Sequence, residues 1–246
     1  MKFSTKKITA VFTILSFMSY GQQGENLVPN PSFENTGKKV KRLGSIESAT
    51  GWVSPTGARA DLFVSSKVED INTPLNIYGK EDAKGGSNYA GVVAYSHGNK
   101  EDRTYIMTKL ESPLKKGMTY CMKFNVSLAE ASKYTVPYVG AVLSKKPFGT
   151  DSKVSIIEEP SLMHFSALQD RLVLSGRYNW TEICGTFVSN GGEKYITIGN
   201  FLDDLESKDK ATKMKPDKKL KVSQIPSSYY YIDDVSIQLL DLERGE

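Results

Sequence analysis

Cysteine, histidine and tryptophan are scarce in this sequence, with two of each among 246 residues. No CxxC pair is present, which argues against a zinc ribbon or a dithiol redox motif. We interpret the two imidazoles, His97 and His164, as surface or packing residues, and no GxSxG, HExxH or P-loop pattern accompanies them. Because catalysis needs convergent groups of this kind, we expect a protein that is not an enzyme.

A strong excess of one charge is also missing. Hydrophobic residues make up 39% and charged residues 24%, an ordinary globular composition that excludes an integral helical membrane protein. The 32 basic and 28 acidic residues give +4, but three lysines fall within residues 1–21, which contain no acid. The near-neutral remainder argues against a nucleic-acid partner. The length suits one domain of about 200 residues.

The first 21 residues have the order of a signal peptide. Lysines precede an apolar stretch, Ile8–Met18, that is too short to span a bilayer. The small residues of Ser19–Gly21 predict cleavage before Gln22, and a buried amphipathic helix is the alternative. We expect an exported chain. No cysteine stands directly after the apolar stretch, where a lipid anchor would be attached, so we do not expect a cysteine-anchored lipoprotein.

Export makes the cysteine pair informative. Cys121 and Cys184 stand 63 positions apart. In an oxidising compartment a disulfide closing such a loop stabilises by about 4 kcal/mol in the chain-entropy model. Two buried thiols are the alternative, since cysteine is often simply buried. The sequence leaves both interpretations open.

Beyond Gln22 the hydrophobic pattern has the period of β-strands. Tyr120–Ala129 alternates, with Tyr120, Met122, Phe124, Val126 and Leu128 on the side predicted to face a core. Many short strands separated by glycine and proline predict a β-sandwich. The other strand candidates are Tyr89–Tyr95, Thr104–Leu110, Val136–Leu143, Thr181–Val188, Tyr195–Phe201 and Tyr229–Leu239.

Two segments are predicted to be long loops. Lys145–Asn179 carries two prolines and two glycines, and Ser161–Leu174 within it is the one candidate for a short helix. Ser207–Ser228 contains seven lysines and two aspartates between positions 208 and 221. Such a charge run is typical of a solvated loop, and contact with anionic headgroups or an acidic glycan is the alternative.

Several segments carry a family resemblance. NLVPNPSFE (Asn26–Glu34) and YYYIDDVSI (Tyr229–Ile237) resemble the first and last strands of jelly-roll carbohydrate-binding modules of families four, nine and twenty-two. Between them lie GWVSPTGARADLF (Gly51–Phe63), SNYAGVVAY (Ser87–Tyr95), LESPLKKGMTYCMKFNVSLAEASKY (Leu110–Tyr134) and GTFVSNGGEKYITIGNFLDD (Gly185–Asp204). Together these segments resemble the N-terminal module of exported OmpA-family outer-membrane proteins of Bacteroidota. The resemblance implies a jelly-roll β-sandwich over residues 22–240, with 241–246 as a tail or linker start. The peptidoglycan-binding OmpA-like domain is not in this sequence, so that activity is not carried over.

The resemblance also implies a structural calcium ion where the first and last strands meet at one edge of the sandwich. Glu34, Asp233 and Asp234 would supply hard oxygen ligands. Strand alternation predicts that at most one of the two aspartates points inward. The alternative is that all three are surface carboxylates or turn partners.

A sugar site would need an aromatic platform with polar neighbours. We take Trp52 as the candidate platform, with Asp61, Tyr89 and Tyr134 as neighbours, although Trp52 in the core is the alternative. The fold analogy would place such a site on the concave sheet.

Two functions follow. The first is a non-catalytic adaptor module of the periplasm or outer membrane that docks on outer-membrane proteins through the two long loops. The second is a carbohydrate-binding module that recognises a polysaccharide on its concave sheet.

Overall fold

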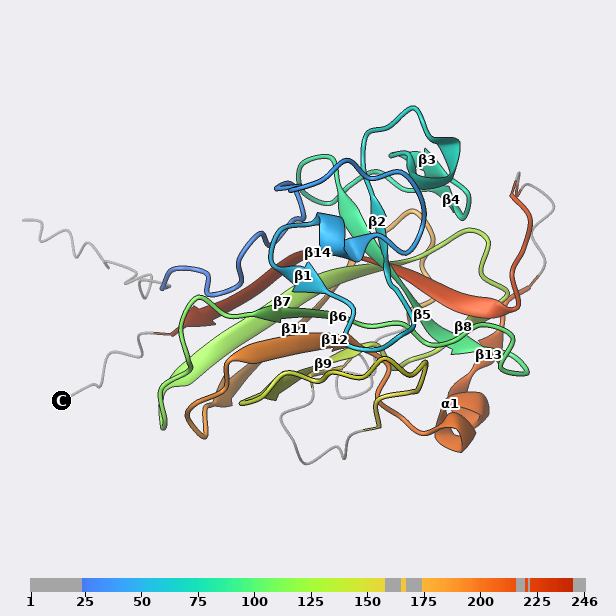
Figure 1. Cartoon of the computed structure of the whole chain (residues 1–246). Helices are drawn as coiled ribbons and strands as arrows, with labels where there is room; N and C mark the ends of the chain where they lie inside the picture. The colour runs from blue at the N-terminus through green and yellow to red at the C-terminus, as the bar shows by residue number, and fades with distance from the viewer. Residues whose placement is uncertain (1–23, 158–164, 167–173, 216–219, 221, 241–246) are drawn as a thin grey trace, which may run out of the picture.

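The computed structural model describes residues 24–157, 165–166, 174–215, 220 and 222–240. Figure 1 shows two main sheets, and every strand pair in them is antiparallel. Sheet I has the order β1 (Trp52–Val53), β6 (Ile106–Lys109), β12 (Tyr195–Gly199), β9 (Gly140–Ser144), β10 (Phe165–Ser166). Sheet II has the order β11 (Thr181–Val188), β7 (Thr119–Leu128), β14 (Ser227–Leu239), β5 (Tyr89–Ser96), β2 (Asp61–Phe63).

Short elements join and cover these sheets. The hairpin strands β3 (Leu75–Asn76) and β4 (Gly79–Lys80) pair with each other, as do β8 (Tyr134–Thr135) and β13 (Thr212–Lys213). The helical elements are η1 (Ile46–Ser48), η2 (Glu69–Ile71) and α1 (Asp204–Lys210).

One hydrophobic core lies between the two sheets. Phe124 and Val126 of β7 join Ile196 and Ile198 of β12 in a single cluster of buried side chains. The alternation predicted for β7 is therefore the one that the strand adopts, with its apolar side turned to sheet I. The all-β sandwich predicted from the sequence is confirmed.

One strand prediction was too long. Val136–Leu143 was expected to be a single strand, but the chain forms β8 just before it and β9 only from Gly140. Pro137 explains the gap, because a proline has no N–H to donate to a ladder. The amide of Val136 instead donates to the hydroxyl of Tyr230 at 3.1 Å.

The lysine-rich segment was predicted to be a loop, and this prediction was partly wrong. It overlaps helix α1, whose N-cap is Asp203, with the Asp203 carboxylate accepting from the amide of Glu206 at 2.8 Å. Strand β13 follows and pairs with β8. Most of the candidate helix Ser161–Leu174 lies outside the described residues, which place β10 within it.

The N-terminal stretch meets the last strand, as the resemblance implied, but in the middle of sheet II. Strand β14 pairs with β5 only as far as Ile232, opposite Ala90. Beyond that point the N-terminal residues take the place of β5. The amide of Leu27 donates to the carbonyl of Ile237 at 2.8 Å, and that of Val235 to Pro31 at 3.1 Å.

The predicted signal peptide (1–21) and the tail (241–246) lie outside the described residues, and both stay predictions. In the described part of the chain, no helix has the length and apolar character needed to cross a bilayer.

Candidate functional site

The outer face of sheet II carries an aromatic cluster that a segment of the same chain covers. Phe63 and Tyr231 contact each other, and each of them is in ring contact with Tyr89 and with Tyr229. The Tyr89 and Tyr231 centroids are 4.9 Å apart. All four are at most 1% exposed. We call this cluster the covered aromatic face and residues 72–84, which include β3 and β4, the cover segment.

Polar contacts attach the cover segment to the tyrosines. The Asn76 amide donates to the Tyr89 hydroxyl at 3.1 Å, and its oxygen accepts from the Tyr231 hydroxyl at 2.9 Å. The ring of Tyr78 stacks on Tyr229 with centroids 4.0 Å apart. Glu81 accepts from the hydroxyl of Ser127 at 2.6 Å. This part of the outer face of sheet II is thus covered by the chain itself.

The predicted sugar-binding residues do not come together. Trp52 belongs to sheet I, is 1% exposed, packs on Phe33 with centroids 4.8 Å apart and donates its indole N–H to the carbonyl of Asn30. Its ring face is therefore not open to a sugar in this structure. This placement agrees with the alternative that Trp52 belongs to the core. Tyr89 and Asp61 lie in sheet II, and Tyr89 is buried beneath the cover segment.

Asp61 serves the interior of the fold. Its carboxylate accepts from the amide of Gly44 and from the hydroxyl of Tyr229, both at 2.5 Å. Burial raises the pKa of Asp61 to about 6, against the lowering effect of these hydrogen bonds. Gly91 makes the contact possible, because a Cβ there would clash with the Tyr229 hydroxyl.

The three predicted calcium ligands do gather at one place, the loop of residues 84–88. Asp233 accepts from the amides of Lys84 and Gly85, at 2.9 and 3.0 Å. Glu34 accepts from the amides of residues 87 and 88, both at 2.8 Å. Burial raises the pKa of Asp233 to about 8.

Asp234 shows why the alternation argument failed. A bulge follows Asp233, and Asp234 has a φ of 50°, so both aspartates approach Gly85. The hydroxyl of Ser32 donates to Asp234 at 2.5 Å. All three carboxylates thus already accept protein hydrogens, and the described residues contain no group of three or more acidic, histidine or cysteine side chains placed to hold a metal. Calcium binding stays a prediction, which equilibrium dialysis against labelled calcium tests.

No disulfide joins the cysteines in the part of the chain that the structure describes. Cys121 faces Thr186 across the β7–β11 pair, and Cys184 faces Lys123, so the two thiols are diagonal neighbours. Diagonal positions are about 7–8 Å apart, beyond the Cα separation that most disulfides span. The disulfide interpretation is therefore corrected. The buried-thiol alternative is also wrong, because Cys184 is exposed and Cys121 half-buried.

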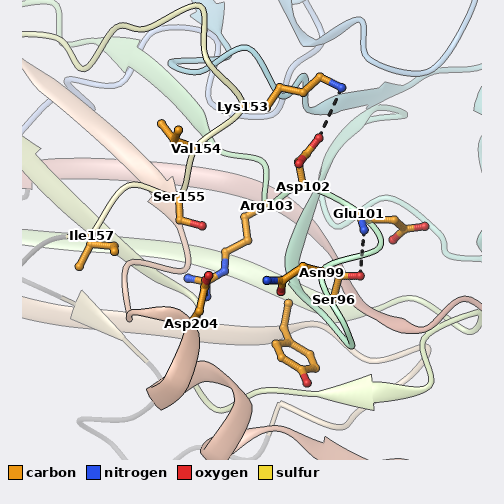
Figure 2. A pocket seen from close by; sticks show the side chains of 11 residues that line it. Ser96, Asn99, Glu101, Asp102, Arg103, Lys153, Val154, Ser155, Ile157 and Asp204 are labelled. Carbon is orange, nitrogen blue, oxygen red and sulfur yellow. Dashed lines mark hydrogen bonds and ion pairs between the residues drawn. The ribbon is translucent and has the colours of Figure 1, made fainter.

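A cleft lies at the end of the sandwich where β5 finishes. Two cavities of about 350 and 400 Å³ share Tyr95, Ser96, Asn99 and Asp204, and we call them together the loop-end cleft. Its walls come from three parts of the chain: the β5–β6 connection, residues 153–157 and helix α1. Figure 2 shows the first cavity, with Lys153 and Asp102 paired on one side and Arg103 beside Asp204 on the other.

Arg103 fixes the floor of this cleft. It is 8% exposed, and its guanidinium pairs with Asp204 at 2.6 Å while donating to the carbonyl of Leu202. A buried guanidinium with these partners holds the start of α1 against the β5–β6 connection. The cleft is therefore built on fixed backbone.

The rim of the cleft is apolar and open. Val154, Ile157 and Leu205 are 50%, 60% and 74% exposed. Tyr134, the fourth predicted sugar-binding residue, is half-buried and stacks on His97 with ring centroids 5.0 Å apart. It therefore borders the cleft through His97, and it belongs to a different sheet from Trp52.

A second open cavity lies on the outer face of sheet II. This sheet groove, of about 440 Å³, is lined by polar side chains including Lys123, Asn125, Glu182 and Ser236. Ser236 is 8% exposed, and its hydroxyl has no hydrogen-bond partner within the described part of the chain. Trp180, half-buried, directly precedes β11 and does not line the groove. Its indole N–H donates to the carbonyl of Asp82 in the cover segment at 2.9 Å, and its ring meets Tyr89 edge-on.

The described residues thus define a class: an all-β sandwich with a covered aromatic face, a loop-end cleft and a polar sheet groove. No protein-family model matches the sequence, and no curated protein matches it.

Solved structures with a similar arrangement include two carbohydrate-binding modules and an adhesin domain. The CBM22-1 xylan-binding domain of Xyn10C from Paenibacillus barcinonensis is 11% identical, with 88% of this chain and 96% of that one covered and a TM-score of 0.42. The C-terminal family 22 module of Xyn10B from Clostridium thermocellum is 12% identical, covering 85% and 91%, with a TM-score of 0.38. The K3 adhesin domain of Lys-gingipain from Porphyromonas gingivalis is 11% identical, covering 89% and 98%, with a TM-score of 0.39. We carry no ligand over from them.

Proposed function

We propose that this chain is a non-catalytic binding module of the cell envelope and that a segment of a partner protein docks in the loop-end cleft. The observation that carries the proposal is the meeting of the two long insertions. Residues 153–157 of the first and Leu205 and Lys208 around the start of the second line the same cleft. Loops held on a rigid scaffold are the usual carriers of binding.

The chemistry of the cleft suits a polypeptide. Val154, Ile157 and Leu205 offer exposed apolar contacts for an anchoring side chain. Ser155 and Asn99 line the polar part, where a bound backbone needs donors and acceptors. A partner segment with one or two apolar residues between polar groups matches this pattern.

The setting of the module is part of the proposal. The signal-peptide pattern of residues 1–21 supports export, and the resemblance to OmpA-family modules supports the periplasm or outer membrane with outer-membrane proteins as partners. In longer proteins of that family, peptidoglycan contact would come from a separate domain.

Site-specific photo-crosslinking in the native host tests the docking proposal. A photoreactive phenylalanine replaces Ile157 or Leu205. Val188 is the matched control because it is 59% exposed at the end of β11 and does not line the cleft. We expect the same outer-membrane protein to be captured from positions 157 and 205 and not from 188. Equal capture from all three positions, or none from the cleft, contradicts the proposal.

A second candidate function is glycan binding in the sheet groove. The unpartnered hydroxyl of Ser236 favours it, together with the amide of Asn125 beside it. Sugar hydroxyls satisfy such groups. Affinity electrophoresis with soluble polysaccharides should then show retardation that Asn125→Ala weakens and Asn99→Ala, in the other cleft, leaves unchanged. Retardation that neither variant changes rules this groove out.

A further inference from the structure

A third cavity, of about 610 Å³, lies between two loops near β2. It is lined by Thr36, Lys39 and Val40 on one side and by residues 64–68 on the other, with Asn88 between them. We call it the lysine cavity. It shares no lining residue with the loop-end cleft or the sheet groove.

Its lining contains donors and no carboxylate. Lys39 and Lys67 supply ammonium groups, and Thr36, Ser65 and Ser66 supply hydroxyls. Both lysines are exposed, and no carboxylate of the described residues lies within 4 Å of either ammonium. Of the cations that line the loop-end cleft, Arg103 and Lys153 are each paired with an aspartate, whereas Lys208 forms no ion pair with a described residue.

The loop that carries Lys39 holds further cations. Lys38, Lys41 and Arg42 are exposed on the loop that carries Lys39, and none of them forms an ion pair with a described residue. The acids nearest in sequence, Glu34, Glu69 and Asp70, do not line the cavity. Glu34 is held by the amides of residues 87 and 88. A cluster of unpaired cations concentrates an anionic ligand.

Both loops are fixed at their bases. Val40 is 4% exposed and anchors the first loop in the core, and Thr36 pairs with Ala49. In the second loop, the amide of Ser66 donates to Asn72 at 3.0 Å and that of Val68 to the Ser66 hydroxyl at 3.1 Å. Lysines on fixed loops bind a ligand with less ordering of the backbone.

We propose that the lysine cavity binds the oxyanion groups of an acidic polysaccharide, whether sulfate, phosphate ester or carboxylate. The ammonium groups of Lys39 and Lys67 contact the anion by charge-assisted hydrogen bonds. The hydroxyls of residues 36, 65 and 66 contact neighbouring sugar hydroxyls, whereas the side-chain amide of Asn88 already donates to the carbonyl of Phe33 at 3.0 Å. This mixture of cations with neutral hydrogen-bonding groups favours a charged sugar over a nucleic acid, for which the lining offers no aromatic ring to stack on a base. The site is independent of the docking cleft.

Titration calorimetry with defined probes tests the proposal. The polymeric probes are heparin and polygalacturonate, with dextran as the neutral control and a single-stranded oligonucleotide of matched charge as the competitor class. Inorganic sulfate, inorganic phosphate and monomeric galacturonate identify the source of the oxyanion. We expect at least one acidic polysaccharide to bind, dextran not to bind, and the affinity to fall as salt is raised.

Two charge-matched double variants locate the site. Lys39→Gln with Lys67→Gln removes the cavity lysines, and Lys145→Gln with Lys146→Gln removes two exposed lysines beyond β9. We expect the first variant to bind the acidic polysaccharide about tenfold more weakly or worse and the second to bind as the wild type does. Equal losses in both variants, no binding of any acidic polysaccharide, or tighter binding of the oligonucleotide overturns the proposal. Binding of the inorganic anions alone reduces the site to a free-anion site and also overturns it. Because the crosslinking at Ile157 and Leu205 does not involve these lysines, the two proposals fail separately.

Discussion

The covered aromatic face and the loop-end cleft both present apolar side chains, but another segment of the chain covers only the first of them. On the covered face, tyrosine hydroxyls and carboxylates find their partners in the cover segment, as Tyr231 does with Asn76 at 2.9 Å. In the cleft, Val154, Ile157 and Leu205 remain at least half exposed around a floor fixed by Arg103. Side-chain chemistry alone therefore does not mark a binding surface. The difference is whether the chain supplies its own partner for that surface.

The largest effect on stability should come from truncating a ring of the covered aromatic face. Tyr231→Ala removes a ring that is 1% exposed and contacts three other aromatic rings. We expect the free energy of unfolding to fall by about 3–5 kcal/mol, the range for large aromatic truncations. Denaturant unfolding measures the change. A loss below about 1 kcal/mol would mean that the cover segment does not seal this face.

A smaller loss is expected at the contact between the cover segment and the tyrosines. Asn76→Ala leaves the buried hydroxyls of Tyr89 and Tyr231 each without one partner, at a cost of about 1–3 kcal/mol. Leu75→Ala is the control, because Leu75 is 58% exposed on the same strand. Hydrogen exchange should show faster opening of residues 74–84 in the first variant only. Equal exchange in both would show that the polar contacts do not hold the segment.

The pH dependence of stability tests whether Glu81 of the cover segment is buried and protonated. Burial raises the pKa of Glu81 from its ordinary value of 4.5 to about 7. The folded protein therefore holds this proton more tightly than the unfolded chain, so the stabilisation is full below pH 4.5 and is lost as the pH rises through 7. Glu81→Gln cannot ionise. Relative to this variant, the wild type should lose about 1 kcal/mol or more between pH 5 and pH 8 in unfolding experiments. A constant difference across that range would exclude a buried, protonated Glu81.

The smallest effect on stability is expected in the cleft. Leu205→Asp changes a side chain that is 74% exposed, so the free energy of unfolding should stay within about 0.5 kcal/mol of the wild type. Capture of the partner protein from position 157 should nevertheless be lost. Val188→Asp, at a position that is 59% exposed on β11, should leave both quantities unchanged. A destabilised Leu205 variant would mean that the rim belongs to the fold rather than to a partner site.

The fold could be predicted from the sequence where the strands alternate in hydrophobicity. The candidate site could not be predicted in this way. The period-2 pattern of Tyr120–Ala129 gave β7 its correct inner face, since that pattern depends only on neighbours along the chain. The bulge after Asp233 broke the same rule, because it depends on the N-terminal residues that replace β5 beside β14.

The placement of the candidate site depends on contacts between distant segments. Arg103 reaches Asp204, and residues 153–157 join the same cleft, although about 50 residues separate each part from the next along the chain. Trp52 looked like a platform because a lone tryptophan near a turn carries no mark of burial. Its partner Phe33 is 19 positions earlier in the chain and was not predicted to reach it.

The amide of Gly24 donates to the carbonyl of Leu239 at 3.0 Å, so the two ends of the described fold lie side by side. A polypeptide enters the sandwich at Gly24 and leaves it at Leu239 on the same side. The domain therefore adds little to the end-to-end length of a chain that contains it. A pulling force applied at these two points separates the first and last segments by breaking their hydrogen bonds one after another. The sandwich should consequently yield early under tension along its own chain while resisting tension applied across β7 and β11.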